Sequence, residues 1–435
     1  MAVNATTPAR PRRGDLLELR IDAVAQGGAG VARAEGFVVF VEGAFPGDVV
    51  RAEITKSKRH YGNARTVEIL QPSEDRVPLR CDHEGGDCPG SPWQTLRYER
   101  QAEYKHELLG DALRRLGGLE GFELEPFVTS DELWRYRNKM EYSFGQDDSG
   151  AVVVGFHRRG RFDRIDDARD CMLASERSNA ARNLVRDWCR AEGLGAYDRR
   201  SGLGFLRNLV IRESARTGDL QVRIVTGEGG FRADALAEKL RQLFPQASVL
   251  WTQTAATAEV TQDGETTLLA GVERLEEQLA GLQFRVSPEA FFQTNTEMAE
   301  RLYGIAVDYA AVRGSERVFD LYCGIGTLTL ALSLHAGEAF GLDVVEDSIA
   351  DAIANAQLNE IENAHFFAGD VRDAIRPLAE RAPHPDVVVV DPPRPGLSKK
   401  VVRRLVEGGH GFEAAAHRMV VRPHRAIAEF LAESR

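Results

Sequence analysis

The chain has 435 residues, of which 43% are hydrophobic and 28% charged, a composition typical of packed globular domains rather than of disordered or coiled-coil proteins. No apolar stretch approaches the about 18 residues that cross a bilayer, and the Arg-rich start lacks the apolar core of a secretory signal. Five cysteines exclude a disulfide scaffold and indicate a reducing, cytoplasmic setting. The formal net charge of -11 argues against a protein that binds nucleic acid over its whole surface, but it leaves room for local basic grooves.

Residues 15–72 are predicted to form a small β-barrel of the OB type after a disordered tail at 1–14. Alternating apolar and polar residues predict strands at 16–24, 37–44, 49–57 and 64–70, separated by turns with Gly and Pro. One edge, residues 51–65, is basic and also carries Tyr61, which suits contact with a nucleic-acid backbone and base. The alternative is a solvated strand edge that its charges protect from aggregation. The basic residues are Arg51, Lys56, Lys58, Arg59 and Arg65, against the single acid Glu53.

Residues 73–94 form a loop without periodicity, and residues 95–280 form a central α+β region. Helical patterns cover 95–119 and 176–193, and strands are predicted at 137–145, 152–159, 205–214 and 220–228. Two further basic clusters, Trp134–Lys139 and His157–Arg161, lie in this region. We expect them to add to a nucleic-acid-binding surface.

Residues 281–435 alternate strands and helices, which predicts a doubly wound α/β domain with a parallel sheet. The apolar strand 317–323 runs into a turn where Gly324 and Gly326 let the backbone pass close to a ligand that a Cβ would block. About 20 residues later, Asp343 ends the next strand, where an acid can hydrogen-bond a ribose hydroxyl. The turn lacks the glycine pattern of pyrophosphate binders, so S-adenosylmethionine fits better than a dinucleotide; the alternative is a βα turn without a ligand.

Two further segments belong to this domain. A buried strand ends in Asp391-Pro-Pro-Arg394, and the prolines stiffen the chain so that Asp391 and Arg394 stay at the carboxyl edge of the sheet, where open α/β sheets bind ligands. Upstream, Phe291 and Phe292 fit a core, and Gln293 beside them offers an amide in an apolar setting.

These motifs together resemble one family. FFQTN, DLYCGIG, GLDVVEDS, FFAGD and DPPRPG occur in the order found in the bacterial RNA (uracil-5-)-methyltransferases, which make 5-methyluridine in tRNA and large-subunit ribosomal RNA. Residues 15–72 resemble the TRAM domain of that family, 73–94 its iron–sulfur segment, and YRNKMEYSF the start of its central RNA-binding region. The resemblance covers nearly the whole chain. It implies a class I methyltransferase domain at 281–435 and a cytoplasmic, monomeric enzyme that binds RNA (rRNA or tRNA) and no membrane.

The resemblance also implies roles for single residues. The residues that would line the S-adenosylmethionine and target-base site are Gln293, Tyr322, Thr327, Asp343, Asp370 and Asp391. Phe291 matches the family aromatic that packs on the target uracil. Cys81, Cys88 and Cys171 match three ligands of a 4Fe–4S cluster, but Ser91 stands at the remaining position. A hydroxyl is a much poorer ligand than a thiolate, so a three-thiolate cluster, a bare loop and an adventitious zinc site all stay open.

The chain departs from the family at the reacting groups. In the family a thiolate adds to C6 of uracil, C5 then takes the methyl group, and a base removes the C5 proton. The thiol lies in an SCxP segment after DPPR and the base is a Glu near the C-terminus, and this sequence has neither. Cys323 is expected to be a small buried residue of the cofactor loop, and Cys189 a packing residue. The domain is therefore expected to be truncated or altered after about residue 406.

A frameshift between about Leu405 and Arg418 is one explanation. Val420-Val421-Arg422-Pro423 falls about where the family has SCxP, and the codons GTC GTG CGA CCC, read one nucleotide later, encode Ser-Cys-Asp-Pro. The unpatterned stretch 407–418 and the early end of the sequence agree with this hypothesis. The alternative is coincidence, because codon degeneracy allows many peptides to be encoded by DNA that spells a different peptide in a shifted frame.

Two other functions stay open. A methyltransferase that acts on an exocyclic amine or a ribose hydroxyl of RNA would need no thiol, but the usual amine-methylating motif has an aromatic residue where this chain has Arg394. A non-catalytic RNA-binding protein would use the barrel and the basic loops instead.

Overall fold

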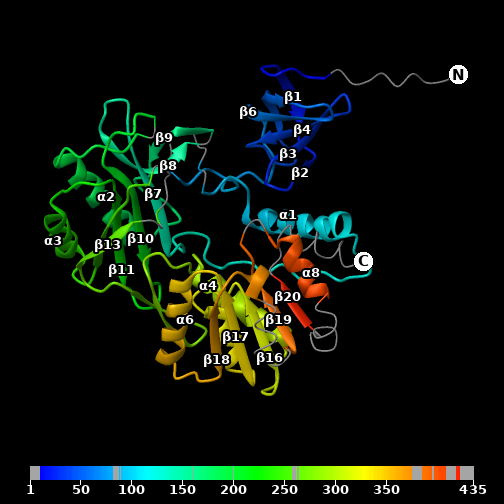
Figure 1. Ribbon diagram of the computed structural model, residues 1–435. Coiled ribbons are helices and arrows are strands. Elements are labelled where there is room, and N and C mark those ends of the chain that lie inside the picture. Colours follow the sequence, from blue (N-terminus) through cyan, green and yellow to red (C-terminus); the bar gives the residue numbers. More distant parts are fainter. Residues whose placement is uncertain are drawn as a thin grey trace. The chain divides into compact units, whose positions relative to one another are not determined.

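The computed structural model describes residues 10–81, 88, 90–158, 160–198, 200–256, 261, 264–374, 385–393, 396–407 and 418–421. The chain divides into two units, Met1–Thr129 with Arg158–Gly160 and Ser130–His157 with Arg161–Arg435 (Figure 1). Among the described helices, none is long and apolar enough to cross a membrane.

The first unit is built around a six-stranded sheet of order β1-β5-β6-β4-β3-β2. The strands are β1 (Leu16–Arg20), β2 (Ala23–Val24), β3 (Gly30–Ala34), β4 (Phe37–Glu42), β5 (Val49–Ser57) and β6 (Tyr61–Gln71). Buried residues alternate with more exposed ones along β4 and β5, as the two-residue period of a strand requires, and residues such as Val39, Val50 and Ile54 share one core. The expected fold of this region is confirmed, with β3 as a strand that the sequence pattern did not predict.

Two further segments of this unit contact the sheet. Residues 10–14, expected to belong to the tail, lie along β5, where the Gly14 N–H donates to the Ile54 carbonyl (2.8 Å). The helix α1 (Tyr98–Asp111) ends in a π-helical turn, η1 (Ala112–Leu116). It packs through Tyr104 in a small core with Phe45 and Leu96.

The second unit begins with a seven-stranded sheet of order β13-β12-β11-β10-β7-β8-β9, which we call the central sheet. Its strands are β7 (Lys139–Gln146), β8 (Val152–Arg158), β9 (Arg161–Asp167), β10 (Leu206–Glu213), β11 (Leu220–Thr226), β12 (Ser248–Gln253) and β13 (Glu265–Ala270). The helices α2 (Glu176–Ala191) and α3 (Ala233–Leu243) pack on it through apolar residues such as Val185 and Leu236. Every residue of β11 is buried, Arg223 included, so both faces of this strand are covered.

A hairpin of β14 (Leu275–Leu279) and β15 (Leu282–Val286) leads into a five-stranded parallel sheet of order β18-β17-β16-β19-β20. Its strands are β16 (Arg317–Leu321), β17 (Glu338–Asp343), β18 (Ala364–Ala368), β19 (Val387–Val390) and β20 (Arg418–Val421), and its helices are α4 (Thr296–Ala310), α5 (Thr327–Ser333), α6 (Glu346–Leu358) and α8 (Lys399–Glu407). Val318 and Val389 share a core with α4 and α5, whereas Phe319 and Val388 share another with α8. Helices therefore cover both faces, which confirms the predicted doubly wound fold (Figure 1).

Candidate active site at the carboxyl edge of the parallel sheet

The parallel sheet gathers most of the predicted site residues at one edge. β16 pairs in parallel register with β17 and with β19, so these strands end together. Strand order reverses between β16 and β19, and open α/β sheets bind ligands at such a point. The predicted residues at or just beyond the strand ends are Tyr322, Asp343, Asp370 and Asp391.

The glycine turn after β16 has an unusual backbone. Tyr322, Gly324 and Gly326 all have positive φ angles, of 72°, 56° and 83°. A Cβ on Gly326 would lie 2.9 Å from the Phe366 ring, so packing requires this glycine. Among the described residues, a Cβ on Gly324 would meet no atom within 4 Å, so the backbone here borders open space. Of the two glycines, it is Gly324 that fits the predicted close approach of a ligand.

Asp343 holds this turn against the end of β17. Its Oδ2 accepts a hydrogen bond from the Gly324 N–H (2.9 Å), and its Oδ1 accepts one from the Val345 N–H (2.9 Å). An ionised carboxylate has about four acceptor positions, so two backbone donors leave capacity for a ribose hydroxyl. The side chain thus positions the turn.

A buried acid, Asp320, lies beneath the turn. It is 1% exposed, and its Oδ2 accepts a hydrogen bond from the Thr329 hydroxyl (2.6 Å). Burial raises the pKa of Asp320 to about 7, and the nearby carboxylates of Asp391 and Asp343 act in the same direction. The sequence analysis gave this residue no role, although an acid within the apolar strand VFDL is a visible signal of a buried polar group.

Tyr303 of α4 joins two of the predicted residues and was itself missed. Its hydroxyl lies 3.1 Å from the Thr327 hydroxyl and also hydrogen-bonds the Gln293 side chain. Burial raises the pKa of Tyr303 to about 12, so the phenol stays protonated at neutral pH. Asp391 lies near enough to contribute to this shift, so the structure brings Gln293, Thr327 and Asp391 together around one phenol.

Phe291 and Phe292 differ sharply in exposure. Phe292 is 5% exposed and belongs to the core shared with α4, whereas Phe291 is 63% exposed. Such exposure is unusual for a large apolar ring between two buried neighbours, Ala290 and Phe292. Phe291 is thus accessible for stacking, and its role toward the target base stays a prediction.

The central sheet anchors the segment that carries Phe291, residues 287–295. The contacts are Asn138 Nδ2 to the Gln293 carbonyl (2.8 Å), Arg212 Nη2 to the Ala290 carbonyl (2.7 Å) and Arg223 Nη1 to Glu289 Oε1 (3.0 Å). Burial lowers the pKa of Arg212 to about 10, which leaves it a cation at neutral pH. The sequence analysis assigned Arg212 and Arg223 no role and placed Asn138 only within a basic cluster and the YRNKMEYSF motif, because each contact joins residues far apart in the chain.

Asp370 is already engaged within its own loop. The Arg372 guanidinium binds both its carboxylate oxygens, with Nε 2.9 Å from Oδ1. The Arg372 hydrogen bonds hold the pKa of Asp370 at about 2, so the carboxylate is ionised over the whole neutral range. The positive charge of Arg372 therefore partly cancels the negative charge that Asp370 could present to a ligand.

The three cysteines predicted to bind a cluster come from different units of the chain. Cys81 and Cys88 belong to the first unit and Cys171 to the second, and all three are buried. Among the described residues, no group of three or more His, Cys, Asp or Glu side chains is arranged to hold a metal ion. The structure therefore gives no support to an iron–sulfur cluster. Cys189 and Cys323 are buried, as expected of packing residues.

Three cations of the basic clusters in the central region pair with carboxylates. Arg135 pairs with Asp170 (2.7 Å), and Lys139 pairs with Glu141 (2.6 Å). Arg161 likewise pairs with Asp163 (3.0 Å). These side chains are therefore weaker candidates for RNA contacts than the sequence alone indicated. Arg394 lies outside the described residues.

The domain has a doubly wound parallel sheet, a glycine turn after its first strand and an acid at the end of the second. These features define a class I methyltransferase-like domain. Family models match at residues 10–67, for the TRAM domain, and at 269–408, for tRNA (Uracil-5-)-methyltransferase. The chain belongs to the tRNA (uracil-5-)-methyltransferase family of RNA methyltransferases.

Relatives along most of the chain agree with this membership. An uncharacterized RNA methyltransferase of Chlorobaculum tepidum is 35% identical over 419 residues, covering 92% of this chain and 86% of the relative. One of Bacteroides thetaiotaomicron is 35% identical over 394 residues, covering 86% of each. In fold, the chain is similar to the Pyrococcus abyssi tRNA (uracil-54, C5)-methyltransferase solved with S-adenosyl-L-homocysteine, with a TM-score of 0.75 and 24% identity over 95% of this chain and 92% of that one.

The buried Asp320 predicts a specific pH dependence of stability. An acid whose pKa is raised by folding stabilises the folded state below its unfolded pKa, and this contribution is lost as pH rises through about 7. We expect the melting temperature of Asp320→Asn, relative to wild type, to rise between pH 5 and pH 8, because Asn never carries the charge. Thermal melts at both pH values measure this difference in melting temperature. Asp308→Asn, which replaces an exposed acid, serves as control. A constant difference between the two pH values would contradict the burial of an acid at this position.

Proposed function

We propose that this chain uses S-adenosylmethionine to methylate C5 of a uridine in a structured tRNA or ribosomal RNA. The observation that carries the proposal is the glycine turn with Asp343 at the carboxyl edge of the parallel sheet. When bound, the cofactor supplies a methyl group on a positively charged sulfonium. Open space at Gly324, a ribose acceptor at Asp343 and the nearby carboxylate of Asp391 suit a cationic nucleoside without phosphates. Membership of the family supports the same assignment.

The remaining side chains fit the target base. Phe291 offers an exposed ring on a segment fixed to the central sheet, which suits packing on a flipped uracil. Gln293 and Thr327 meet at the Tyr303 hydroxyl, between this segment and the glycine turn. A base stacked on Phe291 would therefore lie on the side of the sheet edge where the cofactor is proposed to bind. We assign Gln293, Tyr322, Thr327, Asp343, Asp370 and Asp391 to the lining of this joint site.

Asp343 provides the first test of the cofactor site. Asp343→Ala removes an acceptor for the ribose and leaves the Gly324 and Val345 N–H groups without the acceptor they use in the wild type. We therefore expect the dissociation constant of S-adenosylmethionine, measured by isothermal titration, to rise about tenfold or more. Asp343→Asn, which keeps one acceptor oxygen, should lose less. Asp308→Ala removes the same charge from an exposed position on α4 and should bind like wild type. Equal affinity of wild type and Asp343→Ala, with unchanged melting temperature, would remove Asp343 from the site.

The covalent step of the family reaction lacks its nucleophile in this sequence. Cys323 is the cysteine closest to the C-terminus, and burial raises the pKa of its thiol well above the usual range, which disfavours the reactive thiolate. β20 pairs in parallel with β19, with Val421 opposite Val390. Residue 421 is thus in register with the residue before Asp391, at the edge proposed for catalysis. This is also the position at which the frameshift hypothesis restores a cysteine.

RNA that contains 5-fluorouridine tests whether residue 421 stands where the missing nucleophile belongs, because fluorine at C5 prevents release of the covalent adduct. Two proteins are compared, the chain as written and Val421→Cys. We expect no denaturation-resistant adduct from the chain as written, since no thiolate is available to add to C6. Val421→Cys is expected to gain the adduct, because trapping requires a nucleophile and a methyl donor but no base to remove a C5 proton. Gel electrophoresis under denaturing conditions detects it. An adduct formed by the unaltered chain, or none from a Val421→Cys protein that binds both ligands, would contradict the assignment.

The proposed activity itself is tested in cells. Nucleosides from tRNA and ribosomal RNA are compared by mass spectrometry between cells with and without the gene. Loss of 5-methyluridine from one RNA is the expected result and would identify the substrate. Loss of a different methylated nucleoside would favour a methyltransferase of another specificity, and no change would favour a non-catalytic RNA-binding protein.

A further inference from the structure

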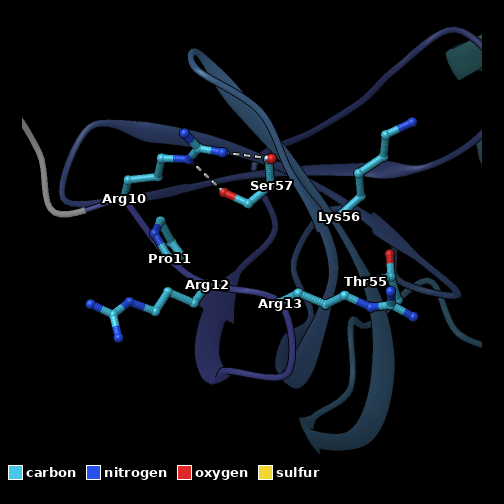
Figure 2. Close-up of a pocket in the computed structure, with 7 residues that line it drawn as sticks. All are labelled: Arg10, Pro11, Arg12, Arg13, Thr55, Lys56 and Ser57. Carbon is cyan, nitrogen blue, oxygen red and sulfur yellow. Dashed lines mark hydrogen bonds between the residues drawn. The ribbon is translucent and has the colours of Figure 1, made fainter.

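A groove of about 800 Å³ lies on the first unit between the N-terminal segment of the chain and β5. Its lining residues are Arg10, Pro11, Arg12, Arg13, Thr55, Lys56 and Ser57 (Figure 2). The set contains four cations and no acid, in a protein whose formal net charge is -11. Such a local excess of positive charge points to an anionic ligand.

The wall formed by the N-terminal segment is held in place by contacts that leave its other cations exposed. Arg10 donates from Nε to the Ser57 hydroxyl (3.0 Å) and from Nη2 to the Ser57 carbonyl (2.7 Å), as Figure 2 shows. Pro11 is buried, and the Arg12 N–H donates to Asp15 Oδ2 (2.6 Å). The groove is therefore formed before any ligand arrives, which lowers the entropy cost of binding.

The cations of this unit fall into two groups. Elsewhere on β5 and β6, which lie inside the sheet and not at the edge that the sequence predicted, Arg51 pairs with Glu68 and Arg65 pairs with Glu53. In the part of the chain that the structure describes, Arg12, Arg13 and Lys56 form no ion pair with a carboxylate. Like charges held on one groove repel each other, and a phosphate group relieves that repulsion.

We propose that this groove binds the phosphate backbone of a single-stranded stretch of the RNA substrate, with cations from the N-terminal segment on one wall and Lys56 on the other. The proposal rests on the RNA substrate of the proposed function. Lys58 and Arg59 extend the positive charge along the turn after β5, and Tyr61 beyond them is 41% exposed. An aromatic ring beside a cationic groove is the usual arrangement of single-strand binding sites, because each base offers a π-face. Arg12 and Arg13 thus belong to the RNA-binding surface, although they precede the predicted barrel.

The salt dependence of binding tests this groove with the full chain. A fluorescent oligouridine serves as probe, and its dissociation constant is measured by anisotropy over a series of salt concentrations. The slope of log affinity against log salt is negative, and each lost phosphate contact reduces its magnitude by about 0.7 for a single strand, so Arg12→Gln with Arg13→Gln should reduce that magnitude by about 1.4. Lys56→Gln should lower it by about 0.7. Arg51→Gln, which removes an equal charge already paired with Glu68, is the matched control and should leave the slope unchanged.

Different results would contradict the proposed groove and the proposed function. If the double variant keeps the wild-type slope, or if Arg51→Gln reduces its magnitude equally, the groove is not the phosphate site, although RNA binding stands. If wild type binds S-adenosylmethionine but no oligouridine, the groove is not a single-strand site, whereas loss of no methylated nucleoside in cells without the gene contradicts the proposed function. Binding to vesicles of anionic lipid that the double variant loses, with unchanged RNA binding, would assign the groove to a membrane surface instead. Melting temperatures within the error of wild type show that the variants are folded.

Discussion

The parallel register between β16 and its neighbours β17 and β19 is the constraint on which the candidate site depends. It brings the glycine turn, Asp343 and Asp391 to one edge although they come from separate strands. The register is firmly specified because successive residues of these strands face different cores: Val318 and Val389 on one side, Phe319 and Val388 on the other. A slip by one residue would exchange these faces and move every strand end, so packing and site geometry are fixed by the same apolar residues.

The second unit uses buried polar groups to extend the site beyond the sheet edge. Arg212 and Arg223 are almost fully buried, and within the described residues Arg223 Nε and Nη2 have no hydrogen-bond partner. Burying a guanidinium with part of its donor capacity unused costs stability. In return, both side chains hold the segment before α4, which carries the exposed ring of Phe291, from the central sheet. The central sheet therefore supports the half of the site that is proposed to bind the base.

The sequence predicted local features well and long-range partners poorly. Short contiguous patterns predicted the turn at Gly324, the acid at Asp343 and the strand at 387–390. The structure has these features where they were expected. Some acids that pair with the basic clusters lie too far along the chain for the sequence to indicate: Glu68 is 17 residues from Arg51, and Asp170 is 35 residues from Arg135. Tyr303 and Arg212 were missed for the same reason, since a tyrosine in a helix and an arginine in a strand carry no sign of their distant partners.

Hydrogen exchange of the full chain with and without S-adenosylmethionine tests most directly that the carboxyl edge of the parallel sheet is the cofactor site. The account predicts slower exchange in peptides that contain Tyr322–Gly326 and Asp343–Val345, where backbone N–H groups surround the Asp343 carboxylate, and unchanged exchange in the barrel strands β1 to β6. Unchanged exchange at the glycine turn under saturating cofactor, or protection confined to the central sheet or the barrel, would contradict it.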